Sequence, residues 1–445
     1  MKLTSNRTRE NSANTEGRSI HPATDEAAES SNVPVESAAD DRRHFIKRAA
    51  RLATLGTTVA AAPLARGNTI PDSWQTPGAD FSNYGQPRSA IDSPIRWVSA
   101  DRSVPGDGVS WTPLHALEGT ITPNGLHFER HHNGVPFVDP ARWQLTIHGK
   151  VDRALAFSLD TLHRYPMVSR TTFIECGGNS NSLWHPNPSQ APSGYVHGLV
   201  SCSEWTGVPL SILLDEAGID IKAGWLIADG YDASGVAVSL PMKKILDDTL
   251  IALYQNGEPV RPENGYPARL LVPGWEGIVN IKWLRSLRVS DKPLMSRFDT
   301  VSYTDLQKDG SFERFSFEMG IKSLITSPTA GDKLSQRGFH QISGLAWTGN
   351  GKVSRVEVSV DNGASWTDAQ LQQPVLDKSL TRFRLPWSWD GSPVKLKSRA
   401  YDSSGQSQPD RDSLLTERGT NMYYHYNAVV IFSINSDGLV RHAYS

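Results

Sequence analysis

A cysteine stands between a strand-forming run and a glycine-rich loop in TTFIECGGNSNS, residues 171–182. Thr, Phe and Ile favour a β-strand, and paired glycines let the backbone turn sharply and approach a ligand closely. The pattern predicts that Cys176 follows a strand and points a soft thiolate, which binds soft metals, into a cavity. Zinc fingers and iron–sulfur clusters usually need four protein ligands. Because the chain has one further cysteine, Cys202, the sequence gives both classes poor support.

Two simpler interpretations of the cysteines remain open at this point. In an exported protein Cys176 and Cys202 could pair as a disulfide. Each could instead be a small buried hydrophobic residue. Composition alone favours these interpretations over a metal site.

The segment around Cys176 resembles the molybdenum-ligand segment of the sulfite oxidase family, and this resemblance reverses that preference. Further segments resemble other motifs of the family in the same order between about Ile121 and Gly419. They are Ile121–His132, Asp139–Leu145, Tyr254–Pro259, Tyr266–Gly274 and Ile281–Leu284. Several separated motifs in one order are much more specific than a single motif.

The resemblance implies a molybdenum–molybdopterin cofactor with Cys176 as the metal ligand, and oxygen transfer to a sulfur compound. It also implies two groups of site residues. The cofactor-binding group is Phe128, Arg130, His132, Cys176, Asp232, Asn264, Arg269 and Lys282. The catalytic group, which faces the substrate, is Arg130, Asn181, Tyr303 and Arg418. Arginine suits oxyanions because its guanidinium stays charged and presents a planar fork.

Two departures from the family pattern bear on the substrate. Sulfite-oxidising members carry arginine five residues after the cysteine, where this chain has Asn181, and Asn264 replaces a family histidine. Each charge-assisted contact contributes roughly 1.5–3 kcal/mol, so losing one weakens the case for a small dianion such as sulfite. Ser201–Val208 and His425–Ala428 resemble the sulfane dehydrogenase branch of the Sox thiosulfate-oxidising system, which implies sulfane sulfur on a carrier protein as substrate.

Other functions stay as alternatives. A sulfite dehydrogenase with a cytochrome c acceptor belongs to the same class, and a secreted sandwich-domain binding protein without redox activity belongs to another. A nitrate reductase is weaker, because those members carry fused haem and flavin domains. His127, His131 and His132 could suggest zinc, but the preceding prolines and glycine disfavour the helix that would align them.

The predicted fold class is α+β, with a molybdopterin domain over 111–312 and an immunoglobulin-like sandwich over 320–445. Leu210–Leu214 predicts a helix that ends at Gly218, and strands are expected at 225–228 and 236–240 around an Asp229-Gly230 turn. Alternation over Val353–Val360, then an Asp361–Gly363 turn and strands near 366, 383–385 and 394–402, predicts the sandwich. The second region also resembles the family's dimerisation domain, which implies a homodimer.

The N-terminal region predicts export. Asp41–Lys47 resembles the twin-arginine motif, and the apolar stretch Leu52–Ala62 is shorter than the roughly 20 residues that span a membrane. We expect a disordered leader and signal over 1–66, an extension over 67–110, and a periplasmic protein exported folded, with no membrane span. A formal net charge of −2 argues against nucleic-acid binding. The haem-attachment motif C-x-x-C-H is absent, so we expect no haem in this chain. Electrons must then leave through another protein, and the resemblance implies a c-type cytochrome subunit as that partner. The two subunits could form a heterotetramer.

Overall fold

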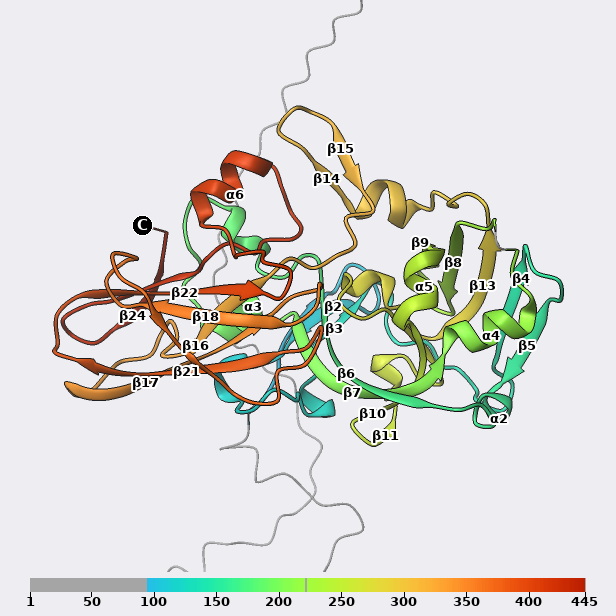
Figure 1. The fold of residues 1–445 in the computed structure, drawn as a ribbon, viewed down its shortest axis with the longest axis horizontal. Coiled ribbons are helices and arrows are strands. Elements are labelled where there is room, and N and C mark those ends of the chain that lie inside the picture. Colours follow the sequence, from blue (N-terminus) through green and yellow to red (C-terminus); the bar gives the residue numbers. More distant parts are fainter. Residues whose placement is uncertain (1–93, 221, 445) are drawn as a thin grey trace, which may run out of the picture. The chain divides into compact units, whose positions relative to one another are not determined.

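The computed structural model describes residues 94–220 and 222–444 (Figure 1). The predicted leader, the twin-arginine motif and the first part of the expected extension lie outside these residues. The structure does not test the predicted domain boundaries, so they stay predictions. No helix in the described part of the chain is long and apolar enough to cross a membrane.

The first large sheet carries the cysteine loop. Its strands run antiparallel in the order β11-β10-β7-β6, and β12 also pairs with β10. Their bounds are β6 Val168–Glu175, β7 Val200–Pro209, β10 Leu250–Gln255, β11 Glu258–Pro259 and β12 Arg269–Leu271. Cys176 directly follows β6, which confirms the strand predicted from its β-rich sequence.

The second sheet packs against helices and holds a separate hydrophobic core. Its order is β5-β4-β13-β8-β9, and β13 and β4 are parallel. The strands are β4 Gln144–Gly149, β5 Leu155–Ser158, β8 Trp225–Gly230, β9 Ala237–Pro241 and β13 Leu284–Ser290. The covering helices are α4 Leu210–Ala217 and α5 Met242–Asp248 (Figure 1).

The helix prediction is confirmed and the turn prediction needs a correction. Helix α4 ends at Gly218, whose φ of 70° is left-handed, a conformation that glycine adopts without steric cost. Asp229 and Gly230 do not form the turn between the two predicted strands. Asp229 pairs with Ala237, so both residues extend β8 and the turn begins at Tyr231.

Shorter elements frame these sheets. A three-stranded sheet contains β1 Trp97–Asp101, β2 Asp107–Trp111 and β3 Glu129–His131, and a hairpin contains β14 Thr304–Leu306 and β15 Phe312–Arg314. The short helices are η2 Leu114–Ala116, η3 Asn124–Leu126, α2 Leu159–Leu162, η4 Asn181–Trp184, α3 Ser193–His197, η5 Pro262–Asn264, η6 Gly277–Val279 and η7 Phe298–Ser302.

The C-terminal region, residues 322–443, forms a β-sandwich, called the sandwich below, whose two sheets lie face to face (Figure 1). One sheet has the order β16-β17-β21-β20, with bounds Lys322–Ser327, Gly338–Trp347, Thr381–Trp389 and Gln370–Leu371. The other has the order β19-β18-β22-β23-β24, with bounds Thr367–Asp368, Val353–Ser359, Val394–Asp402, Ile431–Ile434 and Val440–Ala443. Helix α6 spans Arg411–Arg418. The strands predicted at 353–360, 383–385 and 394–402 are therefore confirmed.

The sandwich and the cysteine-bearing strand share one core. Phe173 and Cys202 belong to the same buried cluster as Leu324, Trp347 and Phe383 of the sandwich. The backbone N–H of Phe173 also donates to the carbonyl of Lys378, at 3.1 Å. Because buried backbone groups need partners, this bond ties β6 to the sandwich just before the cysteine.

Candidate active site

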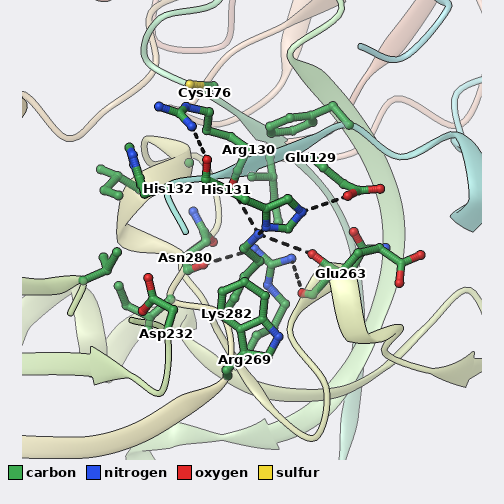
Figure 2. A pocket seen from close by; sticks show the side chains of 18 of the residues that line it. Glu129, Arg130, His131, His132, Cys176, Asp232, Glu263, Arg269, Asn280 and Lys282 are labelled. Atoms are coloured by element: carbon green, nitrogen blue, oxygen red, sulfur yellow. Dashed lines mark hydrogen bonds and ion pairs between the residues drawn. The ribbon is translucent and has the colours of Figure 1, made fainter. Parts of the chain in front are cut away.

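A cavity with about 740 Å³ of empty volume opens beside Cys176. Every predicted site residue except Asn181 and Arg418 lines it: Phe128, Arg130, His132, Cys176, Asp232, Asn264, Arg269, Lys282 and Tyr303. Figure 2 shows Cys176 and Arg130 at one end of this group and Arg269, Lys282 and Asp232 at the other. The side chains come from the ends of β3, β6 and β8, from β12 and from the loop before β13.

Cys176 is held by its backbone, and the residue lines the cavity. Its N–H donates to the Leu199 carbonyl and its own carbonyl accepts from Asn179, each at 2.9 Å. Burial raises the pKa of the Cys176 thiol to about 11, and the nearby Glu276 acts in the same direction. A cation that binds this sulfur must therefore displace a proton, because the thiolate is the ligand form.

Cys202 occupies a different environment. It lies on β7 opposite Phe173, is fully buried, and its sulfur lies 3.3 Å from the Ser379 hydroxyl. Both cysteines are free, so the disulfide interpretation is wrong. The small buried hydrophobic residue is the role that the structure gives to Cys202.

A buried arginine and a partly buried lysine form the basic end of the cavity. Arg269 donates to the carbonyls of Asn264 at 2.8 Å and Asn280 at 3.1 Å, and its buried Nε finds no acceptor in the described part of the chain. The Lys282 ammonium bonds the Arg130 and Glu263 carbonyls and lies 2.8 Å from His131 Nδ1. These acceptors are all uncharged.

Burial of these cations changes their ionisation. It lowers the pKa of Arg269 to about 9, and it lowers the pKa of Lys282 to about 7, where the nearby Arg269 adds to the effect. A buried cation without a counter-ion is costly, and an anion restores the balance. The uncharged acceptors and the unpartnered Nε therefore fit an anionic group such as the cofactor phosphate.

The three neighbouring histidines do not form a metal centre. His127 Nδ1 faces the Phe128 carbonyl, His131 Nε2 bonds Glu129, and His132 Nε2 lies 3.5 Å from the Tyr303 hydroxyl. Among residues 94–220 and 222–444 no group of three His, Cys, Asp or Glu side chains could hold a metal ion. Burial lowers the pKa of His132 to about 4, and Arg130 adds to this effect, so the imidazole is neutral at pH 7. Neutral imidazole can accept or donate one hydrogen bond to a heterocycle such as a pterin.

A second cavity meets the first at Cys176 and has about 1410 Å³ of empty volume. Arg130, His132, Cys176 and Tyr303 line both cavities. Asn181, at the start of η4, lines the second one together with aromatic side chains: Trp97, Trp111, Tyr195, Tyr423 and Tyr424. This entrance cavity is therefore walled mainly by large neutral side chains next to one arginine.

Arg418 lies elsewhere. It ends α6 and lines a third cavity with Trp275, Glu417 and His425, and Cys176 does not line that cavity. Its charge lowers the pKa of Asp305, while burial has the larger, opposite effect. The structure thus brings Asn181 to the cysteine but does not bring Arg418 there.

Three residues at the site were missed by the sequence interpretation: Glu276, Tyr423 and Tyr424. Tyr424 stacks on Tyr303 at 5.2 Å and donates to the Ser302 carbonyl. Glu276 is 4% exposed, and burial raises its pKa to about 8, with a smaller effect from Asp305. Both tyrosines directly precede the His425–Ala428 segment, and Glu276 follows the Tyr266–Gly274 segment by two residues, so adjacency to those motifs was the available signal.

The cysteine loop leaves no room for a side chain at Gly177. A Cβ atom there would overlap the Glu276 carboxylate, whereas a Cβ atom at Gly224 would meet nothing within 4 Å. We therefore expect Gly177→Ala to lower the free energy of unfolding by about 1–3 kcal/mol, the usual cost of overpacking. Gly224→Ala is the matched control and should change it by less than about 1 kcal/mol. Denaturant unfolding of both variants measures the difference, and equal values would contradict the tight packing at Gly177.

Comparison with known proteins agrees with this geometry. The family described as "Oxidoreductase molybdopterin binding domain" matches residues 132–298, and "Mo-co oxidoreductase dimerisation domain" matches residues 313–432. Mitochondrial sulfite oxidase of Mus musculus is 30% identical over 327 residues, which are 67% of this chain and 59% of that protein. A nitrate reductase [NADH] of Ulva prolifera is 29% identical over 67% of this chain and 39% of its own. The chain thus spans about six tenths, or less, of these relatives' lengths.

A solved structure covers more of the chain. The crystal structure of the sulfane dehydrogenase SoxCD from Paracoccus pantotrophus aligns with a TM-score of 0.79 and 41% sequence identity. The alignment covers 83% of this chain and 96% of that one. The two family matches, the extent of this alignment and the cavity beside Cys176 agree with one another. The chain therefore belongs to the sulfite oxidase family of molybdenum-dependent, molybdopterin-binding oxidoreductases.

Proposed function

We propose that the chain is the molybdenum subunit of a sulfane dehydrogenase, with Cys176 as the protein ligand of the metal. The observation that carries this proposal is the 41% identity to a sulfane dehydrogenase over 96% of that chain. The entrance beside Cys176 supports it, because the neutral Asn181 and several aromatic side chains line that cavity.

The described residues would hold the cofactor along the 740 Å³ cavity. Arg269 and Lys282 would bind its phosphate, because both are cations whose backbone hydrogen-bond acceptors are uncharged carbonyls. His132 and Asp232 also line this cavity, and Asp232 lies at the same end as Arg269 and Lys282 (Figure 2). When bound, the molybdenum centre supplies two-electron oxygen-atom transfer, and the protein supplies position and electrostatics.

Arg130 and Tyr303 would orient the substrate sulfur. Both line the two cavities that meet at Cys176. Arg130 bonds Asp107 and the His131 carbonyl, which fix its guanidinium at the junction. Its fixed positive charge would attract the anionic end of a sulfur substrate. Burial raises the pKa of Tyr303 well above its usual value, so the phenol keeps its proton and can donate a hydrogen bond.

The likeness to a sulfane dehydrogenase SoxCD supports a proposal about partners. We propose that a sulfur-carrier protein presents the substrate as sulfane sulfur, and that a c-type cytochrome subunit accepts the electrons. The match to a dimerisation domain supports a homodimer through the sandwich. Sedimentation of the purified chain, alone and with the cytochrome, tests both assemblies. A monomer that does not bind the cytochrome would contradict them.

A sulfite dehydrogenase is the second candidate, because 30%-identical curated relatives are sulfite oxidases. Steady-state cytochrome reduction with free sulfite and with carrier-bound sulfane separates the two candidates. A higher kcat/KM for free sulfite would place the sulfite dehydrogenase first.

The metal assignment predicts different effects for the two cysteines. Cys176→Ser should reduce turnover to background, because a serine hydroxyl does not ionise at neutral pH as the metal ligand requires. Cys202→Ser should retain most activity, since its sulfur is buried against Ser379 and lines neither cavity. Molybdenum content and turnover of both variants are the measurements. Equal inactivation of the two variants would favour a site that needs both sulfurs.

The substrate assignment predicts a shift in preference at Asn181. Asn181→Arg adds a cation to the entrance cavity, so it should raise kcat/KM for free sulfite by about tenfold or more. The larger side chain should also lower turnover of the carrier-bound substrate by narrowing the entrance. Asn181→Gln is the matched control, because it adds length without charge. If the arginine variant gains nothing on sulfite, the electrostatic argument for the substrate fails.

We also propose a periplasmic location reached through twin-arginine export, based on Arg42 and Arg43 in the leader sequence. Replacing both by lysine keeps the charge but removes the guanidinium groups that the export receptor reads. The double variant should accumulate in the cytoplasm with its molybdenum bound. Cell fractionation with a molybdenum assay tests this, and efficient export of the variant would contradict the assignment.

A further inference from the structure

A fully buried carboxylate stands directly before the proposed metal ligand. Glu175 is the last residue of β6 and is 2% exposed. One of its oxygens accepts from Asn179 Nδ2 at 2.8 Å and from Lys322 Nζ at 3.3 Å. The other accepts from the Trp347 indole N–H at 2.6 Å. Both carboxylate oxygens of Glu175 therefore accept hydrogen bonds, directly next to the cysteine loop.

Lys322 contacts this loop at a second point. Its ammonium donates to the Ser180 hydroxyl at 2.7 Å, and Ser180 also lies 2.7 Å from His197 Nδ1. Ser180 has a φ of 66°, a left-handed conformation that costs energy in a residue other than glycine. Because such conformations persist where the surroundings fix them, the Lys322 contact is one of those that hold Ser180. One ammonium group thus bonds both ends of the segment from Glu175 to Ser180.

The two donors to Glu175 from the sandwich, Lys322 and Trp347, lie next to each other. Lys322 on β16 and Trp347 on β17 are directly paired residues of the same antiparallel ladder. Their side chains reach the two different oxygens of Glu175. The ladder places the two backbones opposite each other, and donors on both oxygens hold the carboxylate in one orientation.

We propose that Lys322 is a positioning residue for the metal site: it binds Glu175 before Cys176 and Ser180 before Asn181, and so sets the ligand sulfur and the entrance side chain together. The proposal rests on the assignment of Cys176 as the ligand. It gives the sandwich a role inside the active site of its own chain, in addition to dimerisation. Removing the ammonium leaves Glu175 as a buried charge without its cation, and it releases the left-handed Ser180.

The test compares two lysines of the sandwich. Each pairs with a buried carboxylate that lies outside the sandwich. Lys322→Met removes the ammonium beneath the loop and keeps a similar length. Lys378→Met is the control, because the Lys378 ammonium pairs with Asp248 of α5 and not with the cysteine loop, and the substitution keeps the backbone carbonyl that bonds Phe173. Lys322→Arg keeps the charge and is the conservative variant. Each full-length variant is prepared with molybdenum, and also without cofactor from cells deprived of molybdate.

Two readouts report on the loop itself. The first is the molybdenum retained per chain after prolonged dialysis. The second is the rate at which iodoacetamide alkylates Cys176 in the cofactor-free chain, with the buried Cys202 as the monitor of global unfolding. We expect Lys322→Met to accelerate alkylation of Cys176 by about tenfold or more through local opening, with Cys202 unchanged. It should also retain less molybdenum than wild type, and Lys322→Arg should restore part of both readouts.

The outcomes distinguish the positioning role from the cofactor assignment. Wild-type alkylation and molybdenum retention in Lys322→Met, or equal changes in Lys378→Met, would overturn the positioning role. Should Lys322→Met fail to fold, Trp347→Phe removes the second donor to Glu175 and keeps the ring, and it must then show faster Cys176 alkylation. A wild-type chain that binds no molybdenum would refute the proposed function, while the alkylation rates would still decide the positioning role.

Discussion

Two cations that bond no carboxylate in the described part of the chain determine the arrangement around Cys176. Arg269 is buried and Lys282 is partly buried, and carbonyls and one imidazole are the acceptors that they bond. Burial consequently lowers the pKa of Lys282 to about 7. Such a site is unfavourable until an anion enters it, so the protein's own electrostatics select a negatively charged cofactor. Glu175 and Lys322 differ from these two cations, because they form an ion pair with each other. The basic end of the cavity can therefore bind a ligand, while the Glu175–Lys322 pair supports the cysteine loop.

Two cavities meet at the Cys176 sulfur, and they differ in the kind of ligand that each one suits. The first is basic at its far end and suits a bound cofactor, and the second is aromatic and suits an incoming substrate. Cys176, Arg130 and Tyr303 belong to both. Changes in the entrance, at Asn181 or Tyr423, can therefore alter substrate choice without touching the cofactor end.

The sequence predicted those parts that local patterns encode. The strand before Cys176, the helix that ends at Gly218 and the strand that begins at Val353 all depend on neighbouring residues, and the structure confirms them. Burial along the last of these does not alternate with period two as its sequence does. Motif resemblance assigned Phe128, Arg130, Arg269 and Lys282 to one site, and the structure brings them to one cavity. It could not place Arg418, whose position depends on how α6 packs. It also missed Tyr424 and Glu276, because their contacts join segments that lie far apart in the chain. The Asp229-Gly230 turn was wrong because pairing with β9 extended β8 beyond its local turn signal.

The separation in sequence between Glu175 and Lys322 has a consequence for biosynthesis. The two residues are 147 positions apart, and Trp347 lies 172 positions after Glu175. While the ribosome is still making the first half of the chain, the carboxylate before the cysteine has neither of these partners. Contacts so distant form late, after loop closure over a long segment. The loop that presents Cys176 therefore reaches its final shape only once β16 and β17 have been synthesised and have paired, and a cofactor that needs this loop enters a nearly complete chain.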